Sequence, residues 1–107
     1  MAHIAFSIEK NGDNFSLKLQ GDIWELNIHG SNSEINLLRD LPKTNWTDRK
    51  TIKLGKSANS NTFWTLETND VVIMIGHDDE TWDFAVSIPL NIVNEIITNC
   101  IQMKIIK

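Results

Sequence analysis

The sequence predicts an α+β fold: an antiparallel β meander of six to seven strands, with a short helix after the third strand and a C-terminal amphipathic helix packed on the sheet. Three observations support this fold class. Apolar and polar residues alternate over several short segments, turn-forming residues separate these segments, and the apolar period changes to 3.6 residues after Pro89. The length of 107 residues suits one domain, 1–107.

The first three strands are predicted from period-two alternation near the N-terminus. Asn11-Gly12, followed by Asp13, is typical of a tight β-hairpin, and Gly21-Asp22 marks a second turn. Short turns of this kind place consecutive strands side by side in the sheet. The expected strands are 4–9, 15–20 and 23–28.

A short helix is predicted next. Ser31 and Glu34 have the spacing of a capping box, and apolar residues follow at helical spacing. Pro42 disfavours helical geometry at Leu41, so we expect about two turns of helix that end before this proline. The stretch 43–48 is predicted to be a loop.

Four further segments complete the predicted sheet. Residues 55–61 are polar and turn-like, whereas 71–75 is apolar on both faces and rich in β-branched residues, which favours a central strand. In the last segment, alternation places Trp82, Phe84, Val86 and Ile88 on one face. The expected strands are 51–54, 62–67, 71–75 and 81–88.

The final helix is predicted to begin at Pro89, because the first helical residue needs no N–H group. Its core face is formed by Leu90, Val93, Ile97 and Ile101, flanked by Ile96 and Cys100. At this position Cys100 is expected to be a small buried apolar residue rather than a reactive thiol.

The chain has four tryptophans, and their surroundings differ. Trp24 and Trp82 are in phase with apolar neighbours and are predicted to be core residues. Trp46 lies in a polar loop and is expected to be the most exposed of the four, packed under a loop or against a partner. Trp64 follows Phe63 directly, so one of these two is expected on a less buried face.

Composition excludes several functions. The formal net charge is −4, which does not suit the phosphates of nucleic acid or an anionic membrane surface. A single cysteine forms no internal disulfide, and residues 1–6 do not resemble a signal peptide, so we expect a cytoplasmic protein. The sequence contains no nucleophile elbow, phosphate-binding loop or metal-ligand spacing, so we predict no enzymatic activity, no cofactor and no metal.

The charges are segregated along the chain. The span 67–83 contains six acidic residues and no Lys or Arg, and the span 43–56 contains five basic residues and one acid, Asp48. Two interpretations remain open: the two groups neutralise each other across the sheet, or the acids form one patch beside Trp82 that attracts a basic protein. The acids are Glu67, Asp70, Asp78, Asp79, Glu80 and Asp83, and the bases are Lys43, Arg49, Lys50, Lys53 and Lys56.

In its general character the whole chain resembles bacterial immunity proteins, most of all the immunity partners of contact-dependent growth-inhibition toxins. The stretches that prompt this resemblance are the acidic segment 77–83 and the segment 86–93. The resemblance implies a complex with the C-terminal toxin domain of a co-encoded effector. Such toxins are often nucleases with basic active-site surfaces, which an acidic protein would cover. The expected partner-binding residues are the six acids together with Trp82 and Trp46.

Two other functions are consistent with the sequence. The apolar stripe of the last helix, extended by Ile92 and Met103, would allow a self-associating structural module, that is, a homodimer. A curved meander closed by a helix can also enclose a pocket for a small ligand.

Overall fold

A computed structural model describes residues 4–106 and confirms the predicted fold class, with seven antiparallel strands in sequence order. The N-terminal segment on which the cytoplasmic prediction depends lies partly outside the described residues. Among the described residues, no helix is long and apolar enough to span a membrane. The elements are β1 (Ala5–Asn11), β2 (Asn14–Gln20), β3 (Glu25–Ser31), α1 (Asn32–Ile35), a 3-10 helix (Asn36–Lys43), β4 (Ile52–Ser57), β5 (Ser60–Glu67), β6 (Asp70–Gly76), β7 (Trp82–Pro89) and α2 (Leu90–Gln102).

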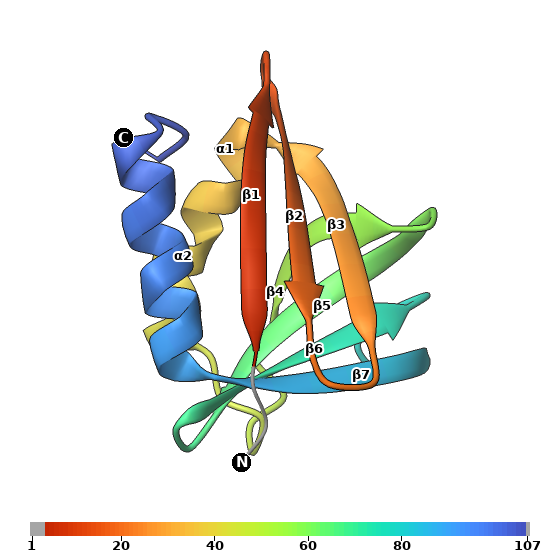
Figure 1. Cartoon of the computed structure of the whole chain (residues 1–107). Helices are drawn as coiled ribbons and strands as arrows, with labels where there is room; N and C mark the ends of the chain where they lie inside the picture. Colours follow the sequence, from red (N-terminus) through yellow and green to blue (C-terminus); the bar gives the residue numbers. More distant parts are fainter. Residues whose placement is uncertain (1–3, 107) are drawn as a thin grey trace.

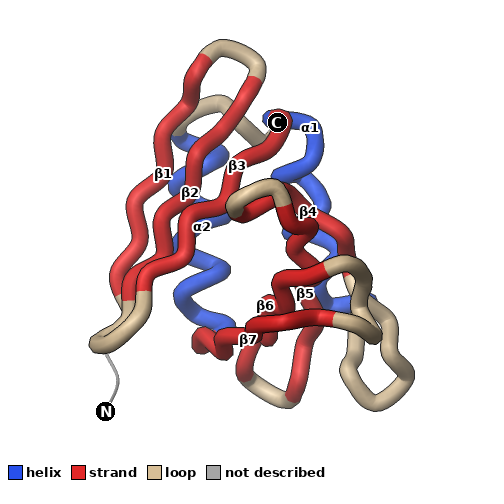
Figure 2. The backbone as a smooth tube through the Cα atoms, turned by 90° about the vertical axis from the view of Figure 1, so that its right-hand side faces the viewer, coloured by secondary structure: helices blue, strands red, loops and turns tan. Residues whose placement is uncertain are grey.

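The sheet bends at β4. Strands β3 and β4 share one register pair, His29 with Lys56, whereas β1–β3 and β5–β7 pair along most of their lengths. In Figure 2 these two halves stand at an angle to each other, with β4 between them. Helix α2 begins where β7 ends and packs against β1, β6 and β7 (Figure 1). It thereby covers the inner face of the bent sheet, where the core lies.

The bend coincides with a β-bulge in β4. The register shifts between Lys53 and Lys56, and Gly55 adopts a left-handed backbone with φ of 75°. Glu34 supports the bulge, because its Oε2 accepts a hydrogen bond of 2.8 Å from the Gly55 N–H. The predicted capping box is also present: Ser31 N–H donates to Glu34 Oε1, and the Ser31 hydroxyl accepts from the Glu34 N–H. One carboxylate therefore ties α1 to β4.

Stability should depend on the ionisation of Glu34. Burial would raise the pKa of this carboxyl, but hydrogen bonds from Gly55 and Ser31 and the charge of Lys53 bring it below its ordinary value of 4.5. Ionised Glu34 therefore contributes stability above that value, and the contribution is lost as the pH falls through the lower folded-state pKa. In urea denaturation, we expect Glu34→Gln to lower the free energy of unfolding by about 1–2 kcal/mol at pH 7 and to weaken its decline in acid. Glu9→Gln, which removes an exposed carboxylate, is the control, and matching profiles for the two variants would contradict the assignment.

Strand β5 provides hydrogen-bond donors for the carbonyl group at the bulge. The Leu54 carbonyl accepts a hydrogen bond of 3.2 Å from the indole N–H of Trp64 and another from the Thr62 hydroxyl. Trp64 is fully buried within the main core. A buried indole needs a partner for its N–H, and the bulge provides one.

Strand β5 is buried on both faces, and as predicted one of Phe63 and Trp64 lies on the less buried face: Phe63 is 8% exposed, whereas Trp64 is fully buried. Phe63 pairs with Met74, and both are buried outside the main core, on the opposite face of the sheet. Two loops are tied over this outer face. The Thr65 hydroxyl donates to the Lys50 carbonyl, and the Thr51 hydroxyl donates to Asp79 at 2.9 Å.

Several element boundaries differ from prediction, and three of the differences involve a turn or a proline. Strands β4 and β5 continue to a two-residue turn at Ala58 and Asn59, both with positive φ, where a polar turn over 55–61 was expected. Pro42 lies inside the 3-10 helix, because the φ of proline fits 3-10 geometry. Pro89 is the N-cap of α2 and the last residue of β7, rather than the first helical residue.

Helix α2 ends in a Schellman motif, with N–H groups of Lys104 and Ile105 donating to the Ile101 and Cys100 carbonyls. Lys104 has a φ of 62°, a conformation that costs residues with a Cβ about 1 kcal/mol. Lys104→Gly should therefore raise the free energy of unfolding by about 1 kcal/mol in thermal or urea denaturation. Lys104→Ala removes the same charge but keeps the Cβ, and an equal gain in this control would show that charge, not backbone strain, is responsible.

Candidate interaction surface

The loop between β6 and β7 is organised by Asp78. Its Oδ1 accepts hydrogen bonds from the Glu80 N–H, the Thr81 N–H and the Thr81 hydroxyl, at 2.8, 2.6 and 2.8 Å. The Thr81 hydroxyl and these backbone groups lower the pKa of Asp78, which is therefore ionised at neutral pH. This carboxylate holds the loop in shape, a role that the sequence did not indicate.

The neighbouring acids carry charge at the surface. Asp79 is half-buried and accepts the hydrogen bond from Thr51, whereas Glu80 and Asp83 are exposed. Among residues 4–106, neither Glu80 nor Asp83 forms a side-chain hydrogen bond or an ion pair. Both carboxylates are therefore free to meet a positive charge.

Trp82 and Phe84 are exposed, at 40% and 46% of their surface, so the prediction of a core position for Trp82 is wrong. For Trp82 the cause is a register shift, in which β7 has one extra residue, Asp83, between the pairs Ile75–Phe84 and Gly76–Trp82, whereas Phe84 stays in phase with Val86 and Ile88. Ile75 and Gly76 are consecutive residues of β6 and therefore belong to opposite faces of the sheet. Their partners Phe84 and Trp82 lie on opposite faces as well. The sequence predicted them on one face.

The predicted acids do not form one patch, because they lie at both ends of β6. Glu67 and Asp70 pair at the β5–β6 turn, whereas the other four follow the far end of the strand. Six residue steps of about 3.3 Å place the Cα atoms of Asp70 and Gly76 about 20 Å apart. Trp46 belongs with the first group, since its backbone N–H donates to the Leu66 carbonyl at 3.1 Å.

Trp46 is half-buried rather than the most exposed tryptophan. The Arg49 guanidinium stands 4.0 Å from the centroid of its ring, a cation–π contact, and the loop packs on the end of β5. These contacts agree with the predicted role of Trp46 in packing a loop.

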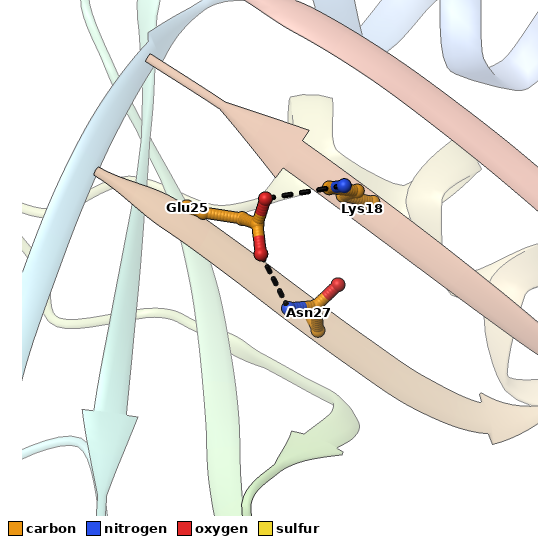
Figure 3. Close-up of polar contacts among 3 residues, drawn as sticks. All are labelled: Lys18, Glu25 and Asn27. Carbon is orange, nitrogen blue, oxygen red and sulfur yellow. Dashed lines mark hydrogen bonds and ion pairs between the residues drawn. The ribbon is translucent and has the colours of Figure 1, made fainter. Parts of the chain in front are cut away.

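The basic segment does not neutralise the acids through ion pairs. Within the described chain, Lys43 pairs with Asp40 at 3.5 Å, and no base of 43–56 pairs with an acid of 67–83. Figure 3 shows the contrasting case of Glu25, which contacts Lys18 at 3.1 Å and Asn27 at 3.3 Å. We call Asp78, Asp79, Glu80, Trp82 and Asp83 the acidic end. It combines uncompensated charge with an exposed aromatic ring.

Other kinds of site have less support. Cys100 is buried, and desolvation raises the pKa of its thiol to about 11, as expected for an inert side chain. No three of His, Cys, Asp and Glu come together to hold a metal ion within residues 4–106. An open hollow of about 650 Å³ beside His29 contains one acid, Glu34, which is already engaged by Gly55.

The α2 stripe is largely used inside the protein. Val93, Ile96 and Cys100 are buried in the core, and flanking residues that include Ile92 and Met103 pack against it. Ile101 is exposed at 46% of its surface, so the prediction that it lies on the core face is wrong. Little of the stripe remains for self-association.

Comparison with known proteins gives no assignment. No family model, no curated protein and no solved structure matches this chain.

Proposed function

We propose that this protein is an immunity protein, which binds a toxin domain through the acidic end and neutralises the toxin by covering its active site. The observation that supports this function is the exposure of Trp82 beside four carboxylates, none of which forms an ion pair within residues 4–106. An aromatic side chain held in water beside unpaired charges gains stability when a partner covers it.

Charge determines the type of partner. Glu80 and Asp83 extend into solvent on a chain whose formal net charge is −4, so a basic surface is attracted from a distance and an acidic one is repelled. The active site of a nuclease is basic because it binds phosphates, and carboxylates can occupy the same positions. Occupation by the acidic end would exclude the nucleic acid substrate.

A growth assay with co-expression tests this function. The polypeptide encoded beside this protein should arrest bacterial growth when expressed alone, and growth should recover when this protein is added. The two should also co-elute in size-exclusion chromatography. Trp82→Ala should weaken binding at least tenfold in calorimetry, as expected for loss of an interfacial tryptophan worth about 2 kcal/mol.

Trp46→Ala is the matched control, since it removes a tryptophan from a loop near the other end of β6 and should leave affinity nearly unchanged. Failure of the two proteins to form a complex would contradict the proposed function. Equal weakening by the two variants would contradict the role of the acidic end.

A further inference from the structure

Strand β7 has an unpaired edge. The strand order places β1 and β7 at the two ends of the sheet, and they do not pair with each other among the described residues. Beyond its pairing with β6, β7 contacts α2, which begins directly after its last residue. Within residues 4–106, no strand other than β6 pairs with β7.

The register identifies the free backbone groups of β7. Glu67 and Asp70 close a two-residue hairpin, and such a closing pair is hydrogen bonded. Hydrogen-bonded pairs alternate along β6, so Ile73 and Val71 bond to their β7 partners Val86 and Ile88. The hydrogen bond of 2.9 Å from the Leu90 N–H to the Asn69 carbonyl continues the same alternation, two residues beyond the pair Val71–Ile88.

The N–H and C=O groups of Ala85 and Ser87, between these bonded residues, consequently point to the free edge. A strand that paired there would bond to both residues. Ser87 is exposed and Ala85 is half-buried.

The two edges of the sheet differ in protection. Strand β1 carries Glu9 and Lys10, charged residues of the kind that discourage strand addition. Along β7 the single charge is Asp83 at the bulge, and Pro89 comes at the last position. The segment between them, 84–88, is an uncharged strand of β-branched, aromatic and small residues. It has the features of an edge that accepts a partner strand.

We infer that the partner binds by adding an extended, Lys- or Arg-containing segment to the β7 edge. This inference rests on the proposed function. Backbone hydrogen bonds to Ala85 and Ser87 would hold the segment. Trp82 and Phe84, on opposite faces of β7, would cover it from both sides. Its positive charge would lie at the Asp83 end, beside Glu80.

Charge selects a basic segment over a second copy of this chain. In a symmetric antiparallel pair, the uncharged end 87–89 of one copy would meet the acidic end of the other. The carboxylates would then gain no positive partner, and two chains of net charge −4 would repel each other.

Amide hydrogen exchange, measured by NMR on the free chain and on its complex with the polypeptide encoded beside it, tests this inference. In the free chain, the amides of Ala85 and Ser87 should exchange faster than those of Val86 and Ile88. In the complex, the Ala85 and Ser87 amides should be protected at least tenfold. A complex in which both exchange as in the free chain would overturn strand addition and leave the proposed function standing, whereas failure to form any complex would contradict the function itself.

Ser87→Pro provides the second measurement, because proline removes an N–H that points away from β6. We expect the variant to keep its circular dichroism spectrum and to bind at least tenfold more weakly than Ser87→Ala, which keeps the N–H. Equal affinities of the two variants would overturn the inference. The free chain could instead sediment as a dimer in which the amides of Ala85 and Ser87 are already protected. That result would overturn the inference and identify a second copy of the chain as the strand that pairs with β7. If Ser87→Pro does not fold, the exchange experiment decides.

Discussion

Trp64→Ala is expected to lower the free energy of unfolding by about 3–5 kcal/mol, the usual cost of removing a large aromatic side chain from a core. Trp64 is fully buried and pairs with Ile52 and Ile73 on neighbouring strands. The substitution leaves a cavity at the centre of the sheet and also removes a hydrogen bond to Leu54 at the bulge. Urea denaturation followed by circular dichroism measures the loss.

Trp64→Phe separates the two contributions. It keeps most of the aromatic volume but removes the indole N–H, while the Thr62 hydroxyl still donates to the Leu54 carbonyl. We expect Trp64→Phe to lower the free energy of unfolding by about 1–2 kcal/mol, which combines the loss of one hydrogen bond with a small loss of buried volume. If Trp64→Ala lowered stability by less than Trp64→Phe, the central position of this residue would be contradicted.

Gly55→Ala is expected to lower the free energy of unfolding by about 2–5 kcal/mol, because it combines backbone strain with a steric clash. The residue has a φ of 75°, and a Cβ built there would lie 2.6 Å from Ile28 Cγ2 and 3.0 Å from the His29 carbonyl oxygen. The latter is backbone and cannot turn aside. Strand β3 would have to move away from the bulge.

Gly12→Ala is a matched control for this prediction. Gly12 has a similar φ of 64°, but a Cβ there would meet nothing within 4 Å. It should therefore show the backbone cost alone, about 1–2 kcal/mol, and the difference between the two variants measures the clash. Equal losses of stability in thermal denaturation would show that β3 and β4 are not closely packed at Gly55.

The sequence predicted the order and type of the elements well, for physical reasons visible in particular residues. Phe15, Leu17 and Leu19 alternate with polar residues, and all three are buried. Asn11-Gly12 opens the first turn, and Gly12 adopts the positive φ that such a turn requires. Short-range signals of this kind depend on neighbouring residues alone and can be read from the sequence directly.

Long-range register could not be predicted in the same way. The bulges at Gly55 and Asp83 depend on how one strand meets another, and a single extra residue changes the face of every side chain beyond it. The change of face at Trp82 follows from the second bulge. Alternation within β7 contains no sign of it, because the aromatic residues keep their spacing of two.

The candidate site was predicted in composition but not in geometry. The acidic residues and Trp82 were identified from charge segregation, yet strand β6 separates Glu67 and Asp70 from the acidic end. The structural role of Asp78 and the exposure of Phe84 were missed. The role of Asp78 depends on the path of the loop 77–81, which folds back towards Thr51.

The most direct test of the account compares two double charge reversals in their affinity for the polypeptide encoded beside this protein. Glu80→Lys/Asp83→Lys and Glu67→Lys/Asp70→Lys change the net charge equally, so location is the difference between them. In calorimetry we expect the first to weaken binding on the order of 100-fold, because like charges would face each other, and the second by a few-fold at most. An equal loss from both, or a larger loss at Glu67 and Asp70, would contradict the assignment of the interface to the acidic end.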